Sequence, residues 1–345
     1  MPGNYKQKFK IFYTSHKKKI FAILRIIVSI GLIAYLVIFR SGFKNFGDFA
    51  ENFKNINIYF IAAAVAMHLL GIWLSAARWK TLLKAQKANI SLGFLSGSFL
   101  IGSFFNNLLP TSIGGDIFRT MDVSKKAGIS AIKSGSIIVI DRFSGIITAA
   151  IYAIISLFLG FTTVGKTTFT IPVVVFFVLS LIIGFILINP AFFKLDRLIN
   201  RVRFLSKIRQ KLKEIYHVFL SFKVYKLALF KAMIFSFALQ IAVIASYYFS
   251  AKSIGIELSF ASFIFIVPIV SIISFLPISI GGAGLRENSL VILMTALGAS
   301  RETSTASSLI IFAIILFMGI IGAVIYIIRP FVLKQNQDPK QQPKC

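Results

Sequence analysis

Long apolar segments dominate the hydrophobic pattern of this chain of 345 residues. Each segment holds about 20 residues, the length that an α-helix needs to cross the hydrocarbon core of a bilayer. Polar and basic residues gather in the shorter segments between them. The pattern predicts an all-α polytopic membrane protein with about six full spans, at residues 20–39, 57–77, 132–160, 171–189, 232–250 and 305–328.

The composition excludes a soluble globular domain. Hydrophobic residues make up 57% of the chain and charged residues 14%, whereas soluble domains have about 45–50% apolar and about 25% charged residues. The three histidines lie far apart in the sequence, and Cys345 is the single cysteine. We therefore expect neither a metal site nor a cofactor.

Two further apolar segments, 91–115 and 259–300, are interrupted by proline and glycine. Lys and Arg in short loops mark the cytoplasmic side of a membrane protein. If 91–115 crossed fully, Arg119 and Lys125 would lie outside and every later loop would have the wrong sign. We expect instead two re-entrant helix pairs, the first entering from the cytoplasm and the second from outside, in a plasma-membrane protein with both termini cytoplasmic.

The two interrupted segments also resemble each other. Leu109–Arg119 aligns without gaps to Leu276–Arg286, and seven of the eleven positions are identical. Because the two copies open to opposite sides, the chain contains an inverted repeat, with repeat 1 at about 57–160 and repeat 2 at about 232–328. Matched Pro/Gly-interrupted segments in two halves point to a transport site. The alternative, a simple helix break, explains the proline and glycines but not the matched arginine.

The repeated motif carries chemistry that suits an anion. Paired glycines permit a new half-helix to begin and a ligand to approach the backbone, and we expect these half-helices to end at Gly128 and Gly298. Free N–H groups at a helix N-terminus attract anions, and an arginine one turn further adds a planar fork for phosphate. The candidate substrate-binding residues are Pro110, Ser112, Gly114, Gly115, Asp116, Arg119, Asp141, Arg142, Pro277, Ser279, Gly281, Gly282, Arg286 and Glu287.

Three of these candidates have two open interpretations. Asp116 has no counterpart in the second copy. It either has a structural role, capping the half-helix or pairing with Arg119 three residues on, or contacts the substrate. Asp141 and Arg142 lie within a predicted span, where a charge costs at least about 2.5 kcal/mol. They either form structural ion pairs with Arg119 or Asp116 or contact the substrate.

The net charge of +27 is concentrated beside the spans, so we expect no nucleic-acid partner. The connector 190–231 has eleven Lys and Arg against two acidic residues, and its apolar residues recur at helical spacing. It should lie on the inner membrane surface and contact anionic lipids of the inner leaflet. The predicted organisation is a basic cytoplasmic tail at 1–19, a transmembrane domain at 20–330 and a polar cytoplasmic tail at 331–345.

Several of these features together carry a resemblance to a known family. Arg78-Trp79 after a span, the first motif through Arg119, Asp141-Arg142, and the second motif through Glu287 resemble the flippase-like transmembrane family of the lysylphosphatidylglycerol synthases, over about residues 20–330. The resemblance implies a membrane region that moves an aminoacylated phospholipid across the bilayer. Fused members carry a separate soluble domain that makes this lipid from aminoacyl-tRNA, and we expect this chain not to carry that domain.

The sequence therefore predicts a lipid flippase or transporter that is not an enzyme. Its substrate would be a phosphate-containing lipid, aminoacylated lipids included, and its partners a second copy of the chain or a separate lipid-modifying enzyme. The alternative is an enzyme or accessory subunit of lipid-linked glycan or aminoacyl-phospholipid synthesis. Residues 160–167 fit the P-loop pattern, but they lie in a short loop between spans, so we expect no nucleotide binding.

Overall fold

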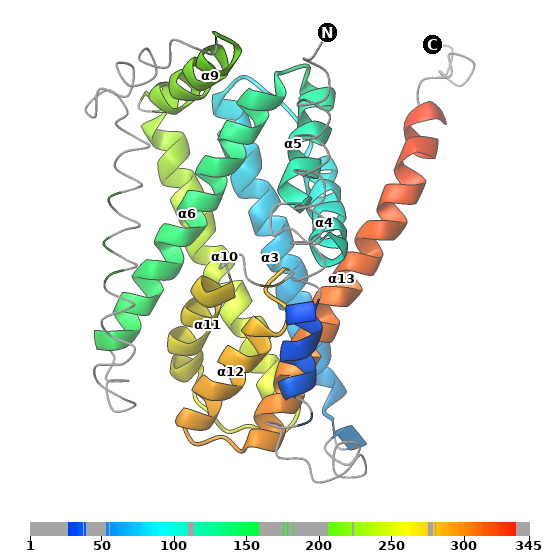
Figure 1. Cartoon of the computed structure of the whole chain (residues 1–345), viewed down its shortest axis with the longest axis vertical. Helices are drawn as coiled ribbons and strands as arrows, with labels where there is room; N and C mark the ends of the chain where they lie inside the picture. The colour runs from blue at the N-terminus through cyan, green and yellow to red at the C-terminus, as the bar shows by residue number, and fades with distance from the viewer. Residues whose placement is uncertain are drawn as a thin grey trace, which may run out of the picture.

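The computed structural model of the chain is a bundle of helices (Figure 1). It describes residues 27–36, 38, 53–54, 56–109, 114–158, 175, 178, 182, 206–222, 224–274, 279 and 281–335. Within these residues every regular element is a helix, as the hydrophobic pattern predicts. The labelled helices are α3 (Ile58–Ala85), α4 (Leu92–Leu108), α5 (Gly114–Ala127), α6 (Ala131–Phe158), α9 (Ser206–Phe222), α10 (Lys226–Lys252), α11 (Phe260–Ser274), α12 (Leu285–Ala296) and α13 (Arg301–Gln335).

Four long helices are apolar enough to cross a membrane. They are α3, α6, α10 and α13, and they confirm four of the six predicted spans. Residues 27–36 are helical inside the first predicted span, while the rest of that span and most of 171–189 lie outside the described residues. The helices also run past the predicted limits, because α3 continues to Ala85 and α13 to Gln335.

The central pair of the bundle is formed by α3 and α10, which pack side by side. The Ser246 hydroxyl of α10 donates to the carbonyl of Ala64 of α3 at 2.9 Å, so a buried hydrogen bond joins the two helices. α10 packs directly against Gly71, where a β-carbon would lie in ordinary van der Waals contact with Leu239, 3.4 Å away. Small residues and interhelical hydrogen bonds of this kind are what join helices in a bilayer, where lipid is as apolar as leucine.

The shorter helices form two hairpins at opposite ends of the bundle (Figure 1). The first hairpin, α4–α5, enters and leaves at the end where α9 lies, which we call the α9 end. The second hairpin, α11–α12, enters and leaves at the other end, which we call the α12 end. Each hairpin thus begins and ends at the same end of the bundle (Figure 1).

Each hairpin packs against the long helix of the other half. α4 lies along α13, and α11 lies along α6. At the first of these crossings the backbones touch, because a β-carbon on Gly322 would overlap the carbonyl oxygen of Leu100. A β-carbon on Gly319 would lie 2.6 Å from the amide nitrogen of Asn107. Glycine is therefore required on α13 for this crossing.

The ends of the half-helices follow the glycines in most cases. α5 begins at Gly114 and ends before Gly128, which has a φ of 64°, and α12 ends before Gly298, which has a φ of 99°. These limits confirm the prediction for α5 and for both C-terminal ends.

The prediction that Gly281-Gly282 opens the second half-helix is wrong. These glycines have φ values of 54° and 81°, which a right-handed helix cannot include. α12 instead begins at Leu285, after Gly284. The Glu287 carboxylate accepts the Gly284 N–H at 2.6 Å and so fixes the helix start there.

The helix α9 covers the end of the bundle next to α6. Its Val218, Phe219 and Phe222 side chains are buried in a cluster with Trp79 of α3. The Gln86 amide also donates to the Ser221 hydroxyl at 2.6 Å. The amphipathic connector predicted from the sequence therefore buries part of its apolar face against protein.

Candidate functional site

Five charged side chains from α3, α5 and α6 form one continuous network. Arg78 donates to Asp141 at 2.7 Å, and Arg119 donates to the other oxygen of Asp141 at 3.3 Å. Arg119 also donates to Asp116 at 3.1 Å. Arg142 closes the series with two bonds to Asp116, at 2.8 and 2.9 Å. Positive and negative groups alternate along the network, so each carboxylate is shared by two arginines.

Arg119 lies at the centre of this network and is almost fully enclosed. Its guanidinium carbon lies 3.6 Å from the ring centre of Phe99 and 4.3 Å from that of Trp79. Its side chain is only 4% exposed. The arginine of the first motif is therefore held by two carboxylates and two aromatic rings, and its Nε has no hydrogen-bond partner among the described residues.

Arg142 lies at the accessible end of the network. Its side chain is 36% exposed, and the Asp116 carboxylate beside it is 15% exposed. A partly exposed arginine with a fixed orientation can donate further hydrogen bonds to an oxyanion. Of the network's arginines, Arg142 is thus the one best placed to meet a ligand.

Two adjacent cavities lie against the network. One, of about 320 Å³, is lined by all five network residues. The other, of about 280 Å³, is lined by Arg142 and by Arg286 of the second motif. Both cavities are close to the lower limit of about 300–1,000 Å³ that is typical of small-molecule sites. They share four lining residues from both hairpins and α6, namely Ser103, Asn106, Arg142 and Ser271.

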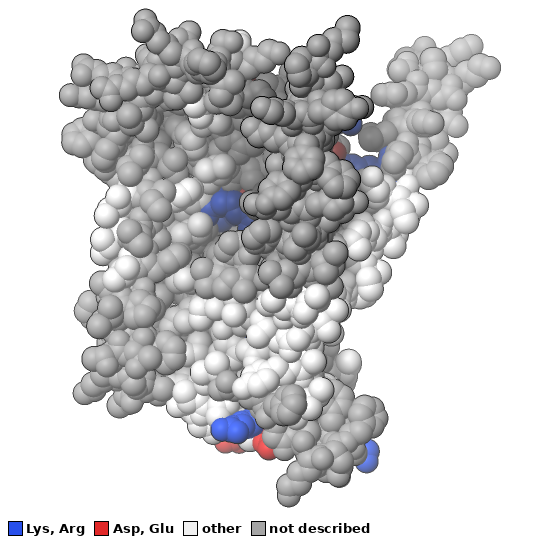
Figure 2. Space-filling model, in the orientation of Figure 1, with Lys and Arg blue, Asp and Glu red and all other residues white. Residues whose placement is uncertain are grey.

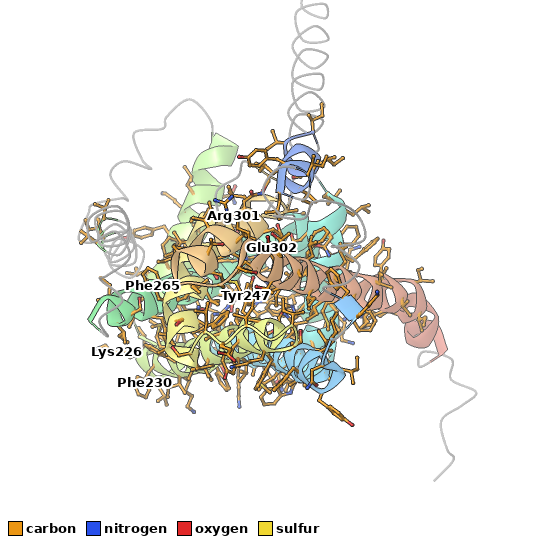
Figure 3. All side chains as sticks on the ribbon, turned by 90° about the horizontal axis from the view of Figure 1, so that it is seen from below. Lys226, Phe230, Tyr247, Phe265, Arg301 and Glu302 are labelled. Carbon is orange, nitrogen blue, oxygen red and sulfur yellow. The ribbon has the colours of Figure 1, made fainter. Side chains whose placement is uncertain are left out.

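The second motif contributes a simpler pair. Arg286 donates through two nitrogens to a single oxygen of Glu287, whose other oxygen caps Gly284. Tyr247 of α10 lines the same cavity and lies in the interior of the bundle in the view from below (Figure 3). The pair is buried. Glu287 caps the start of α12 through the Gly284 N–H and also fixes the orientation of the Arg286 guanidinium.

The two motifs meet near the middle of the molecule. A β-carbon on Gly281 would lie 3.1 Å from the main-chain oxygen of Asn106, so the tip of one hairpin contacts the other. The Gly115 N–H donates to the Asn106 side chain at 2.8 Å. A β-carbon on Gly115 would overlap the carbonyl of Gly102. Close packing inside the hairpin therefore accounts for Gly115 without any ligand.

The structure brings most of the predicted site residues together, in two groups. Arg119, Asp116, Asp141 and Arg142 belong to the network, which makes structural ion pairs one role of both aspartates. Ser279 is buried and its hydroxyl has no partner among the described residues. The predictions for Pro110, Ser112 and Pro277 concern positions outside the described residues.

Arg78 is a network residue that is not among the candidates from the sequence. The predicted span ends at residue 77 and places Arg78 after it, whereas α3 continues for eight residues beyond that point. The signal was the position of Arg78 in an otherwise helical pattern without a glycine or proline break. Its guanidinium also bonds Ser236 of α10 at 3.1 Å, and Gly145 leaves room for it.

The lining of the cavities has an excess of positive charge. Four arginines line the two cavities against two aspartates. One positive charge remains in excess when Glu287, the ion-pair partner of Arg286, is counted as well. The Gln240 amide nitrogen, on a buried side chain lining the larger cavity, has no partner among the described residues. Figure 2 shows basic side chains at the surface near the middle of the molecule, apart from the charged groups at its lower end. The site therefore offers donors to an anion.

The fold and the site define a multi-pass helical membrane protein with a charged cavity between two hairpins. The chain belongs to the family described as the lysylphosphatidylglycerol synthase transmembrane region, whose model matches residues 23–322. It is also similar to a UPF0104 membrane protein of Pyrococcus horikoshii. The identity is 23% over 275 residues, which cover 74% of this chain and 82% of that protein.

Proposed function

We propose that this chain moves a phosphate-containing lipid between the leaflets of the plasma membrane. The observation that carries the proposal is the pair of cavities between the hairpins, which four arginines line against two aspartates. A buried charge is costly in a membrane and is usually kept for a substrate or ion pathway. Membership of a family named for a lipid synthase supports a lipid as the substrate, aminoacylated phospholipids included.

In this proposal Arg142 and Arg286 hold the phosphate, and the acyl chains stay in lipid. Both arginines line the smaller cavity, one from each half of the chain. Arg119 is enclosed by two carboxylates and two aromatic rings. Its main role is to orient Asp116 and Asp141. Asp116 is also exposed enough to accept a hydrogen bond from the ammonium group of an aminoacylated headgroup.

Alternating access follows from the inverted repeat in this proposal. α3, α4–α5 and α6 correspond to α10, α11–α12 and α13, and the two hairpins open to opposite ends of the bundle (Figure 1). Repeats of this kind exchange two mirror conformations around a fixed midplane site. The basic α9 end is assigned to the cytoplasm by its lysines and arginines. The transporter then needs neither a catalytic step nor a cofactor.

The test is transport in liposomes. The purified protein is reconstituted with fluorescent phosphatidylglycerol or with lysyl-phosphatidylglycerol, and the appearance of the lipid in the other leaflet is followed without ATP. We expect faster movement than in protein-free liposomes. Arg142→Lys and Arg286→Lys keep the charge but lose the two-point geometry of the guanidinium. Each should slow transport by about tenfold or more, the effect of one lost charge-assisted hydrogen bond.

Arg301→Lys is the matched control, because Arg301 is exposed at the α12 end (Figure 3) and lines neither cavity. It should transport at the wild-type rate. If no lipid in an anionic and aminoacylated panel moves faster than in empty liposomes, the proposal fails. Conversion of a lipid into a new product would establish the alternative, an enzyme of lipid-linked synthesis.

A further inference from the structure

A third cavity lies at the α9 end of the bundle, between the end of α3 and the beginning of α10. Its volume is about 600 Å³, larger than either central cavity. One wall consists of Lys80, Thr81, Lys84 and Ala85 of α3. The other consists of residues around the start of α10, namely Val224, Tyr225, Leu227, Ala228, Lys231 and Phe235. None of these residues lines the proposed transport site, so this basic groove is a separate feature.

The charge of the basic groove is positive without compensation. Lys80 and Lys84 lie one turn apart on the same face of α3, and Lys231 faces them from α10. Neither helix contains an acidic residue. The ion pairs formed within the described part of the chain all use arginine, so none of the three lysines pairs with a carboxylate there. Three uncompensated lysines around one hollow attract an anion.

The rest of the basic groove is apolar and open. Val224 is 81% exposed and Leu227 is 65% exposed, and Ala228 and Phe235 continue the apolar wall along α10. Lys226 and Phe230, which begin the same helix, lie at the edge of the bundle in Figure 3. Loop lysines that only mark the cytoplasmic side need no such hollow beside them. A ligand here meets charge at one end and apolar side chains at the other.

We propose that the basic groove binds an anionic phospholipid of the cytoplasmic leaflet. The phosphate lies among Lys80, Lys84 and Lys231, and one acyl chain lies along Leu227, Ala228 and Phe235. An amphiphile is the occupant because a soluble anion would leave the apolar wall uncovered. An acidic protein segment would have to displace the membrane lipid that surrounds the exposed side chains of α10. The site does not depend on the proposed transport, and its occupancy is measured separately.

The test compares lipid binding by matched variants in detergent. Native mass spectrometry and thermal unfolding are recorded while phosphatidylglycerol, phosphatidylcholine or inorganic phosphate is added to the full-length protein. The variant Lys80→Gln/Lys84→Gln/Lys231→Gln removes three charges from the groove. Lys125→Gln/Lys126→Gln/Lys133→Gln removes three at the same end outside it. We expect phosphatidylglycerol to bind and stabilise the wild type and the control variant, and phosphatidylcholine and phosphate to do neither.

The groove variant should bind phosphatidylglycerol about a hundredfold more weakly, since each lysine near an anionic surface contributes roughly fivefold. Ala228→Trp fills the apolar wall without changing charge, so it should weaken binding in a protein with the wild-type lysines. Equal binding by the groove and control variants would overturn the proposal. Stabilisation by phosphate alone, or equal binding of phosphatidylcholine, would overturn it as well.

Discussion

Arg329 at the end of the membrane-spanning part of α13 bonds Asp122 of α5 at 2.8 Å. The guanidinium also lies 3.5 Å above the ring of Phe94 and donates to the carbonyl of that residue. Asp122 accepts a second bond from the buried Ser98 hydroxyl of α4. One arginine of the second half thus fastens both helices of the first hairpin at the α9 end.

This fastening should stabilise one conformation of the protein. Arg329→Gln and Asp122→Asn each break the pair, whose side chains are about one-sixth exposed. The loss should lie between the roughly 0.2–1 kcal/mol of exposed pairs and the about 3–5 kcal/mol of buried ones. Thermal unfolding in detergent measures it, and the double variant should lose less than the sum of the single variants. Additive losses would show that the two residues act independently.

Asp141→Asn should be one of the most destabilising single changes in the chain. It leaves Arg78 and Arg119 charged and buried with no carboxylate between them, which costs about 3–5 kcal/mol. The yield of folded protein and its melting temperature test this. Adding Arg119→Met should recover part of the loss, because it removes a charge and keeps an apolar chain between Phe99 and Trp79. A variant Asp141→Asn as stable as the wild type would contradict the network.

Two glycines, Gly322 at the α4–α13 crossing and Gly93 in the first turn of α4, should respond oppositely to alanine. Gly322→Ala drives a β-carbon into the Leu100 carbonyl and should prevent the crossing, with loss of folded protein. A β-carbon on Gly93 of α4 would have no atom within 4 Å. Gly93→Ala should therefore stabilise the helix by about 0.5–1 kcal/mol. Fluorescence-detected size exclusion after a heating series compares the two. Equal melting temperatures would place the helices further apart than described.

The opposite orientation of the hairpins is testable by labelling. Cys345 is replaced, and single cysteines are introduced as Lys125→Cys at the end of α5 and Ala296→Cys at the end of α12, both exposed positions. An impermeant thiol reagent added to intact cells should label the second and not the first. After the cells are opened, both should react. The same accessibility for both in intact cells would rule out the inverted repeat.

Much of the fold could be predicted because a bilayer restricts the choices. Apolar runs of about 20 residues have to form helices there, and the loop charges fixed which interrupted segments return to their own side. Helix ends were harder to predict. The α3 helix continues past residue 77 because Arg78, Lys80 and Lys84 are all good helix formers. A hydropathy pattern ends the span at residue 77 because it detects only where the apolar residues stop.

The sequence singled out four of the five charged residues of the network, but neither Arg78 nor the connections among them. Asp141 and Arg142 stood out as rare charges within a predicted span, and Asp116 and Arg119 as members of the repeated motif. The sequence could not show that Arg119 is enclosed by Phe99 and Trp79, since rings are common in such helices. It also could not show that Gly281 meets Asn106, a contact made across the two repeats. Polar lining residues such as Gln240 carry no pattern that separates them from other polar residues in helices.

The exchange of hairpins between the two halves changes what can move as a unit. Gly322 and Leu100 bring α13 and α4 into backbone contact, and α11 packs along α6. A motion that separated the two repeats from each other would have to break the packing of α4 on α13 and of α11 on α6. Each long helix is therefore interlocked with the hairpin of the other repeat, so we expect the two repeats to move together and not as two separate rigid bodies.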